Sequence, residues 1–351
     1  MVAILVGVAG LAMPQSRSPN LAQCGSNLLS ADGNISACTA VIESAGQTNI
    51  ILAKALHNRG VSYDLKRQRD RAIQDYDQAI RLQPDFAAAF NNRGLDYAFK
   101  GQYDRAIQDY DQAIRLQPGL AEAFNDRGLA YKEKGQYDRA IQDYDQAIRL
   151  KPDLAEALNN RGLAYDNRGL YDRAIQDYDQ AIRLEPDSVN AFYNRGNAYR
   201  AKGEYDRAIQ DYDQAIRLKP DLAEAFNNRG RAYVAKGQYD RAIQDFDQAI
   251  KLKPDFAIAF SNRGRANFHL ARFSEATIDL QRSLDLNPSR AYDVLWLHLA
   301  KGLIGQDDAR DFTRQVERID PTQWPAPVAR LYLGQATPEQ VLAAAARSLT
   351  A

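Results

Sequence analysis

The sequence has little of the side-chain chemistry that most binding and catalytic sites use. It contains two cysteines, two tryptophans and three histidines in 351 residues, and no excess of charge of either sign. Lysine plus arginine and aspartate plus glutamate are both 45, so the formal net charge is zero. Nucleic-acid-binding proteins usually carry an excess of basic charge, which replaces phosphate counterions. We therefore expect no nucleic-acid partner.

The common catalytic motifs are missing as well. The sequence has no nucleophile elbow, no Walker phosphate loop, no dinucleotide glycine pattern and no zinc-ligand spacing. The three histidines, His57, His269 and His298, lie far apart in the sequence and read as groove or surface residues. We predict that the chain is not an enzyme and that it binds neither a metal ion nor a cofactor.

Long apolar runs are also absent, apart from one short run at the N-terminus. Met1–Met13 is continuously apolar or small and ends at Pro14. This run is too short to span a bilayer as a helix, but it fits the apolar region of a secretory signal peptide, although no lysine or arginine precedes it. We predict a signal peptide or disordered N-terminus over residues 1–18, a periplasmic or secreted protein, and no transmembrane span in the mature chain. The alternative is a cytoplasmic protein with a disordered apolar N-terminus.

The two cysteines, Cys24 and Cys38, lie in residues 19–52, which we predict to be a helical segment before the repeated part of the sequence. An even number of cysteines beside a signal-like segment favours one disulfide in an oxidising compartment. Cys38 lies in Ile35–Glu43, which reads as a short amphipathic helix onto which the segment containing Cys24 can fold back. The alternative is two unrelated reduced thiols.

Most of the remaining chain repeats with a period of 34 residues. The sequence YDRAIQDYDQAIRL occurs unchanged four times, at Tyr103–Leu116, Tyr137–Leu150, Tyr171–Leu184 and Tyr205–Leu218. With Ala53 as position 1, seven units cover residues 53–290, and their first residues are Ala53, Ala87, Ala121, Ala155, Val189, Ala223 and Ala257. A period of this length indicates a stack of small structural units rather than one globular core.

Each unit reads as two helices that approach closely. Glycine at position 8 and alanine at position 20 leave room for the approach, and aromatic residues at positions 4, 11 and 24 fill the space beside them. A glycine at position 15, as in Gly101, ends the first helix, and a proline at position 32 ends the second. The aspartates that follow this proline, Asp85, Asp153 and Asp221, are predicted to cap the next helix.

These positions resemble the tetratricopeptide repeat, with aromatic or leucine at 4, glycine at 8, tyrosine at 11, alanine at 20 and 27 and proline at 32. The resemblance covers Ala53 to Arg290. It implies an all-α fold, a right-handed superhelical solenoid of antiparallel helix pairs, whose first helices line a concave groove that receives peptides or partner proteins.

The resemblance also implies which residues face the groove. Position 6 forms a ladder of amides that can hydrogen-bond an extended peptide, or that only tethers neighbouring helices: Asn58, Asn92, Asp126, Asn160, Asn194, Asn228 and Asn262. Position 9 is apolar in the first four units and becomes Asn197, Arg231 and Arg265 in the last three. With Tyr193 and Arg200, these residues predict a groove that is apolar toward its N-terminal half and basic toward its C-terminal half. An apolar ligand with an acidic end would suit it.

An arginine stands at position 7 of every unit. We interpret this ladder as structural and predict that it pairs with aspartates of the second helices, such as Asp109 and Asp143. Ligand binding is the less favoured alternative.

Residues 291–351 are predicted to form a degenerate eighth helix pair and capping helices. Tyr292–Ile304 and Asp307–Arg318 read as the pair, followed by a short helix over Ala326–Leu333 and a last helix that Thr337 and Gln340 open as a capping box. Tyr292–Leu342 resembles the C-terminal part of NlpI-like periplasmic repeat proteins of Gram-negative bacteria, which implies an adaptor that brings envelope enzymes together. In such proteins we expect another helix pair after this stretch, which would cover the last helices. Without that pair, we expect the last helices to expose apolar surface and the protein to self-associate.

The function predicted from the sequence is therefore a non-enzymatic scaffold that holds a peptide or protein partner, in the bacterial periplasm. The alternative is a cytosolic co-chaperone or regulatory-complex subunit of the same architecture. Neither the composition nor the repeat identifies the partner.

Overall fold

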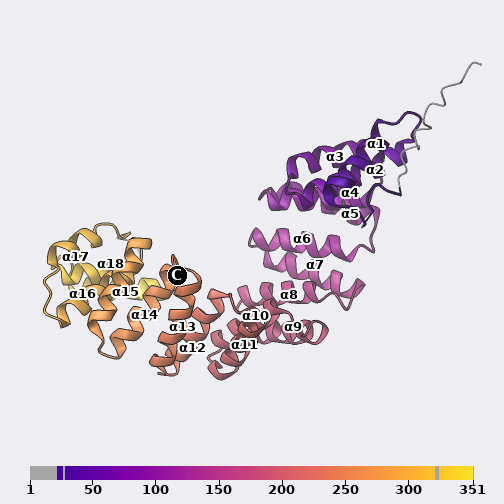
Figure 1. The fold of residues 1–351 in the computed structure, drawn as a ribbon. Helices are drawn as coiled ribbons and strands as arrows, with labels where there is room; N and C mark the ends of the chain where they lie inside the picture. The colour runs from indigo at the N-terminus through magenta and orange to yellow at the C-terminus, as the bar shows by residue number, and fades with distance from the viewer. Residues whose placement is uncertain (1–21, 27, 321–323, 351) are drawn as a thin grey trace, which may run out of the picture. The chain divides into compact units, whose positions relative to one another are not determined.

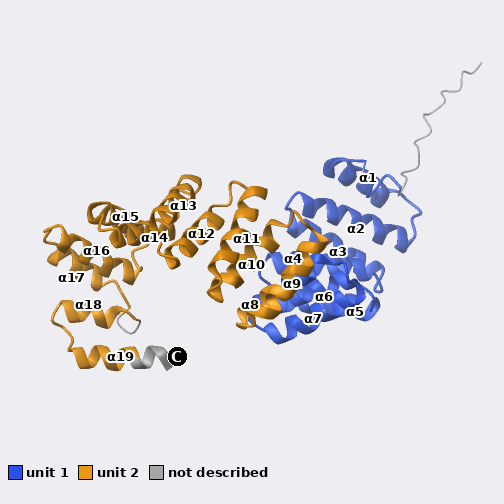
Figure 2. Ribbon diagram, turned by 90° about the horizontal axis from the view of Figure 1, so that it is seen from below, with its two compact units in different colours: residues 1–160 blue, residues 161–351 orange. Residues whose placement is uncertain are grey.

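The computed structural model describes residues 22–26, 28–320 and 324–350 (Figure 1). The predicted signal segment over residues 1–18 lies outside the described residues. The chain divides into two compact units, residues 1–160 and 161–351, which Figure 2 colours blue and orange.

The described residues contain nineteen helices and no strand, so the predicted all-α class is confirmed. Consecutive helices pack against each other as pairs, as the solenoid prediction requires. The helices are α1 Ala31–Glu43, α2 Asn49–Leu65, α3 Arg69–Leu82, α4 Ala87–Phe99, α5 Tyr103–Leu116, α6 Ala121–Glu133, α7 Tyr137–Leu150, α8 Ala155–Asn167, α9 Tyr171–Leu184, α10 Val189–Ala201, α11 Tyr205–Leu218, α12 Ala223–Ala235, α13 Tyr239–Leu252, α14 Ala257–His269, α15 Phe273–Leu286, α16 Ala291–Leu303, α17 Ala309–Val316, α18 Ala326–Tyr332 and α19 Pro338–Thr350.

Helix ends follow the repeat closely. The first helix of each of the second to seventh repeats begins at the residue chosen as position 1. Position 15 has a positive φ in each of them, at a glycine in the second to sixth repeats, as at Gly101 with 71°, and at Ala271 in the seventh. The predicted aspartate caps are wrong for Asp85 and Asp221. Phe86 and Leu222 occupy the cap positions instead, and neither side chain bonds to the helix. The reason is packing, because Phe86 lies against the apolar cluster around Leu56, which fixes it directly before α4.

The two helices of a repeat meet where glycine faces an aromatic ring. Tyr144 on α7 is fully buried, and a Cβ atom added to Gly128 on α6 would lie only 2.8 Å from its Cε1 atom. The same close approach recurs in five other repeats, with Tyr76, Tyr110, Tyr178, Tyr212 and Phe246 as the aromatic partner, and in the seventh repeat Gly264 faces Leu280 instead. Position 8 is therefore glycine because any side chain would push the second helix away.

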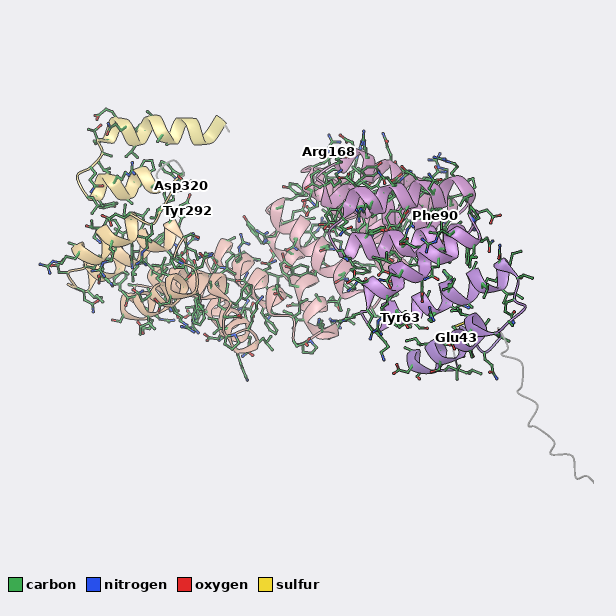
Figure 3. All side chains as sticks on the ribbon, turned by 90° about the horizontal axis from the view of Figure 1, so that it is seen from above. Glu43, Tyr63, Phe90, Arg168, Tyr292 and Asp320 are labelled. Atoms are coloured by element: carbon green, nitrogen blue, oxygen red, sulfur yellow. A yellow bond between two sulfur atoms is a disulfide. The ribbon has the colours of Figure 1, made fainter. Side chains whose placement is uncertain are left out.

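The position-7 arginines join helices both within and between repeats, which confirms their predicted structural role. Arg127 donates to both oxygens of Asp143 in its own repeat, at 2.6 and 2.8 Å, and to Asp111 of the preceding repeat at 2.6 Å. Burial opposes the charge of Arg127, but its hydrogen bonds with these two carboxylates outweigh that cost and raise its pKa. Arg93, whose guanidinium lies 5.5 Å from the ring centre of Phe90, makes the same contacts with Asp109 and Asp77. Phe90 is labelled in Figure 3.

The N-terminal segment closes the first compact unit. Cys24 and Cys38 form a disulfide, as predicted. Helix α1 packs on α2 and takes the place of the second helix of a preceding repeat. Its Thr39 accepts a hydrogen bond of 3.1 Å from Arg59. In later repeats an aspartate of the preceding second helix accepts the equivalent bond, as Asp111 does from Arg127. The loop before α1 is held in turn by Asn58, which donates to the carbonyl oxygen of Cys24 at 3.1 Å.

The eighth helix pair docks on the seventh repeat through a buried polar network. Asp293 on α16 is 1% exposed and accepts hydrogen bonds of 2.6 Å from Ser261, Ser283 and Arg290. In all seven repeats the position equivalent to Asp293 is alanine. In the first six repeats the position equivalent to Ser261 is asparagine, histidine or tyrosine, and the position equivalent to Ser283 is alanine. Several substitutions that form one network mark where the regular array ends.

The helices from α16 to α19 differ from the predicted ones in their length or in their first and last residues. The second helix of the eighth pair, α17, covers eight residues rather than the whole of Asp307–Arg318. The predicted capping box is present, because Thr337 and Gln340 exchange hydrogen bonds of 2.9 and 3.3 Å. Leu342 on α19 is 70% exposed, and self-association stays a prediction. Among the described residues, no helix combines the length and apolar character needed to cross a membrane.

The close approach at position 8 is testable with two glycines that both lie within helices. Alanine is normally better than glycine there by about 0.5–1 kcal/mol. We expect Gly302→Ala, whose Cβ atom meets nothing within 4 Å, to be neutral or stabilising. Gly128→Ala should instead lower the free energy of unfolding by about 1–3 kcal/mol, since the ring of Tyr144 must move. Urea titrations of both variants check this, and an equal effect at the two sites would contradict it.

Candidate functional site

Three arginines on the first helices of the second compact unit stand outside the arginine–aspartate pairs that join the repeats. Arg200 on α10, Arg231 on α12 and Arg265 on α14, called the basic strip from here on, form no ion pair with any carboxylate that the structure describes. On the same helices, each position-7 arginine is paired: Arg195 with Asp211, Arg229 with Asp245 and Arg263 with Asp279. Burial and the neighbouring charges of Arg200 and Arg265 lower the pKa of Arg231. The three charges therefore act on one surface.

Polar side chains are fixed beside the basic strip. The Tyr212 hydroxyl donates to Asn197 Oδ1 at 2.8 Å, and Asn228 Nδ2 donates to that oxygen and to the Tyr193 hydroxyl at 2.9 Å each. The rings of Tyr193 and Tyr212 lie 6.0 Å apart. The predicted residues Tyr193, Asn197, Arg200 and Arg231 are thus brought together, on α10 and α12.

Aromatic rings lie at the α16 end of the basic strip. The Arg265 guanidinium lies 5.7 Å from the centre of the Trp296 ring, and Trp296 packs edge-on against Phe268 at 4.8 Å. His269 stacks on Tyr239 with ring centres 4.9 Å apart. Arginine over tryptophan is a favourable pairing that still leaves the guanidinium donors free for a ligand.

The first compact unit has an apolar pocket of about 180 Å³ between α4 and α6. Its walls include Leu95, Ala98, Phe99 and Leu129. Its polar groups come from Tyr103, Tyr110, Asp126 and Glu133. Both leucines stand at position 9, the position that the sequence analysis identified as apolar in the first four repeats. We call this site the α4–α6 pocket.

Two polar groups of the α4–α6 pocket are poorly satisfied. The Tyr110 hydroxyl is buried and has no hydrogen-bond partner among the described residues. Asp126 accepts only long hydrogen bonds, of 3.4 Å from Asn91 and 3.5 Å from Asn125. Burial, more than any neighbouring group, raises the pKa of Asp126 to about 7.

The ladder at position 6 links adjacent repeats through its amide donors. Asn92 bonds to His57 at 3.0 Å, Asn160 to Asn125 at 3.1 Å, and Asn262 to Asn227 at 2.9 Å, in each case at position 5 of the preceding repeat. These contacts are those of the tethering alternative. Peptide binding by the ladder, Asn194 included, stays a prediction, and a ligand would have to use the acceptor oxygens that remain.

A second buried carboxylate, Asp96, replaces the small residue found at position 10 of every other repeat. It is 1% exposed, lies 3.8 Å from Arg69, and neither of its carboxyl oxygens has a hydrogen-bond partner in the described part of the chain. Arg69 itself replaces the aromatic residue that begins the other second helices. Burial and the nearby carboxyl of Asp64 raise the pKa of Asp96 to about 8.

Other hollows and polar pairs do not single out a site. Cavities of about 380, 430 and 300 Å³ lie at the equivalent starts of α5, α3 and α9, so this hollow recurs from repeat to repeat. His298 bonds to Asp308 at 2.7 Å and stacks on Phe312, which binds α16 to α17. We interpret both features as products of the packing.

Sequence reasoning missed the α4–α6 pocket. Tyr110 looked like any other aromatic residue at position 24, and Phe99 was not singled out at position 13. The available signal was the single aspartate, Asp126, in a ladder that is otherwise asparagine.

Comparison with known families agrees with the repeat. Tetratricopeptide-repeat models match residues 53–86, 155–188 and 177–210, and related models of the same repeat match residues 94–135, 128–169, 196–234 and 230–270. No curated protein sequence matches this chain. The resemblance of Tyr292–Leu342 to NlpI-like proteins therefore stays a prediction.

Several solved structures share the fold. A tetratricopeptide repeat protein from Parabacteroides merdae is 22% identical, with a TM-score of 0.55 over 71% of this chain and 98% of its own. The Cut9–Hcn1 hetero-tetramer of the APC/C gives 0.59 at 18% identity, over 77% of this chain and 52% of the other. Pseudomonas aeruginosa pilF gives 0.54 at 18% identity, over 62% of this chain and 96% of its own. At these identities the likeness shows the fold alone.

The buried carboxyl of Asp96 predicts a pH-dependent stability. Its pKa rises from 3.8 to about 8 on folding, so the folded state binds more protons in that window and stability falls as pH rises through it. Asp96→Ala restores the alanine of five other repeats, and we expect it to remove part of this fall. Urea titrations at the two ends of the window measure the effect. Exposed Asp153→Ala serves as control, and an unchanged pH dependence in Asp96→Ala would refute the assignment.

Proposed function

The chain belongs to the tetratricopeptide-repeat family, and on that premise we propose that it is a non-enzymatic scaffold that captures an acidic segment of a protein partner on its basic strip. The first helices of the second compact unit provide the surface. The partner's carboxylates bind Arg200, Arg231 and Arg265, and its backbone contacts the fixed polar groups of Tyr193 and Asn197.

One observation carries the proposal. In a chain whose other first-helix arginines are paired with aspartate, the three arginines of the basic strip form no ion pair among the described residues. Asp166 is near enough for its charge to act on Arg200, but the two form no ion pair. Each guanidinium presents several donors in a plane, which suits a carboxylate better than any neutral group. Like charges gathered in this way repel one another, so an acidic ligand relieves that repulsion as well as filling the donors.

The setting of Tyr193 and Asn197 supports specificity. Both are oriented by hydrogen bonds within the chain, so little conformational freedom is lost when a ligand contacts them. Trp296 and His269 extend the surface beyond Arg265 and can receive an apolar residue that follows the acidic segment.

We place the scaffold in an oxidising compartment, the bacterial periplasm or outside the cell. The disulfide between Cys24 and Cys38 supports this placement, because structural disulfides persist in such compartments. Isolation of the protein from cells under thiol-trapping conditions tests it. Both cysteines should be protected from alkylation, and two freely alkylated thiols would instead favour the cytoplasm.

The basic strip is tested with a fluorescent hexaglutamate peptide and fluorescence anisotropy. We expect Arg231→Glu combined with Arg265→Glu to weaken binding by about tenfold or more, because two attractive charges become repulsive. Arg183→Glu with Arg217→Glu changes the net charge equally, at exposed last turns of α9 and α11, and should have little effect. Equal losses in the two double variants would show that only net charge matters and would sink the proposal.

A further inference from the structure

We propose that the α4–α6 pocket binds a lysine side chain of a partner protein, with the aliphatic stem between Leu95, Phe99 and Leu129 and the ammonium group on Asp126 and Tyr110. The lysine belongs to a protein partner, so the proposal rests on the scaffold function. It concerns a different surface and a different charge, however, and it is tested without the acidic ligand.

The pocket exists because of residues that the other repeats do not share. Asp126 is the one carboxylate in a ladder of asparagines, and Phe99 is the one phenylalanine at position 13. The wall formed by Leu95 and Leu129 belongs to the apolar stretch of position 9. The combination arises once, between α4 and α6, whereas a by-product of the repeat would recur.

Asp126 has acceptor capacity that its surroundings do not use. No lysine or arginine of the described residues forms an ion pair with it, and its two amide contacts, at 3.4 and 3.5 Å, are at or beyond the usual length. A partly buried carboxylate without a cation is destabilising, and a ligand cation offsets this cost. Glu133 at the rim cannot play this part, since Lys132 already pairs with it at 3.0 Å.

The Tyr110 hydroxyl lacks a partner for a reason that the repeats make visible. In the fifth repeat the equivalent Tyr212 donates to Asn197 at position 9. In the second repeat position 9 is Leu95, which offers no polar atom, so the Tyr110 hydroxyl is left unpaired in the same pocket as Asp126. A phenol oxygen can accept a hydrogen bond as well as donate one.

A lysine side chain matches these features together. It has a flexible four-carbon stem, a compact ammonium group and three donors with no acceptor. The stem can lie along apolar walls while the ammonium group reaches a carboxylate and a hydroxyl. A carboxylate ligand would meet Asp126 with like charge, and a neutral apolar side chain would leave both polar groups unsatisfied. Bound ammonium also favours the ionised form of Asp126, whose pKa burial has raised.

The test uses the full chain with methyl-labelled leucines and two small probes of matched shape. n-Pentylammonium carries the lysine stem and charge, and 1-pentanol carries the stem with a neutral hydroxyl. Titrations above pH 7, where Asp126 is ionised, are followed at the methyl signals of Leu95 and Leu129. We expect pentylammonium to shift both signals and to bind about tenfold or more tightly than pentanol.

Two variants each introduce a residue that another repeat of this chain already has at the same position. Asp126→Asn copies the asparagine of the other six repeats, and Tyr110→Phe copies Phe246 at the same position of the sixth repeat, so both should fold. Asp126→Asn should remove the preference for pentylammonium over pentanol. Tyr110→Phe should weaken pentylammonium by a smaller factor, about two- to tenfold, the loss of one hydrogen bond.

Three results would overturn the lysine pocket: no shift of Leu95 and Leu129 with pentylammonium, equal binding of the two probes, or unchanged preference in Asp126→Asn. Binding of hexaglutamate separates this outcome from that of the scaffold proposal. Asp126→Asn should leave hexaglutamate binding intact, whereas the double variant of Arg231 and Arg265 should lose it and keep the pentylammonium response.

Discussion

The interaction on which the structure depends is the arginine at position 7, held between two aspartates. One aspartate lies on the second helix of the same repeat and the other on that of the repeat before, as with Arg127, Asp143 and Asp111. Partly buried pairs of this kind add little net stability, because burial of charge is costly. Their geometry is demanding, however, so they fix how each repeat docks on the last. One side of every first helix is thereby committed to the scaffold.

The other side of the first helix is free to vary, and its variation is coupled to the core. Where position 9 is Leu95, the Tyr110 hydroxyl beneath it is unpaired; where it is Asn197, Tyr212 bonds to it. Where position 9 is arginine, the tyrosine is absent, and Phe246 or Leu280 takes its place. Substitution at position 9 therefore changes both the surface and the hydrogen bonding of the buried aromatic residue at position 24. This coupling lets a uniform scaffold carry a basic strip on one compact unit and an apolar pocket with an acidic end on the other.

The fold followed from the sequence because the period, the glycines and the prolines act locally. Each sets a helix end or a close approach within about one repeat, and so the starts of α4 to α14 matched the repeat register. The arginine ladder was predictable for the same reason. Prediction from local signals failed where a side chain packs in the core or contacts a residue of another repeat. Phe86 takes the cap position because it packs in the core, and Asp126 and Tyr110 form a pocket only because different repeats bring them together. The C-terminal helices were placed less well, since their pattern has decayed.

The central claim is that the scaffold separates arginines that hold it together from arginines that bind. Arginine side-chain spectra, in which each Nε–Hε group gives its own signal, measure this directly while hexaglutamate is added. The account predicts that the signals of Arg200, Arg231 and Arg265 move, and that those of the paired arginines such as Arg195, Arg229 and Arg263 stay in place. Shifts spread evenly over exposed arginines, or confined to the paired set, would contradict it.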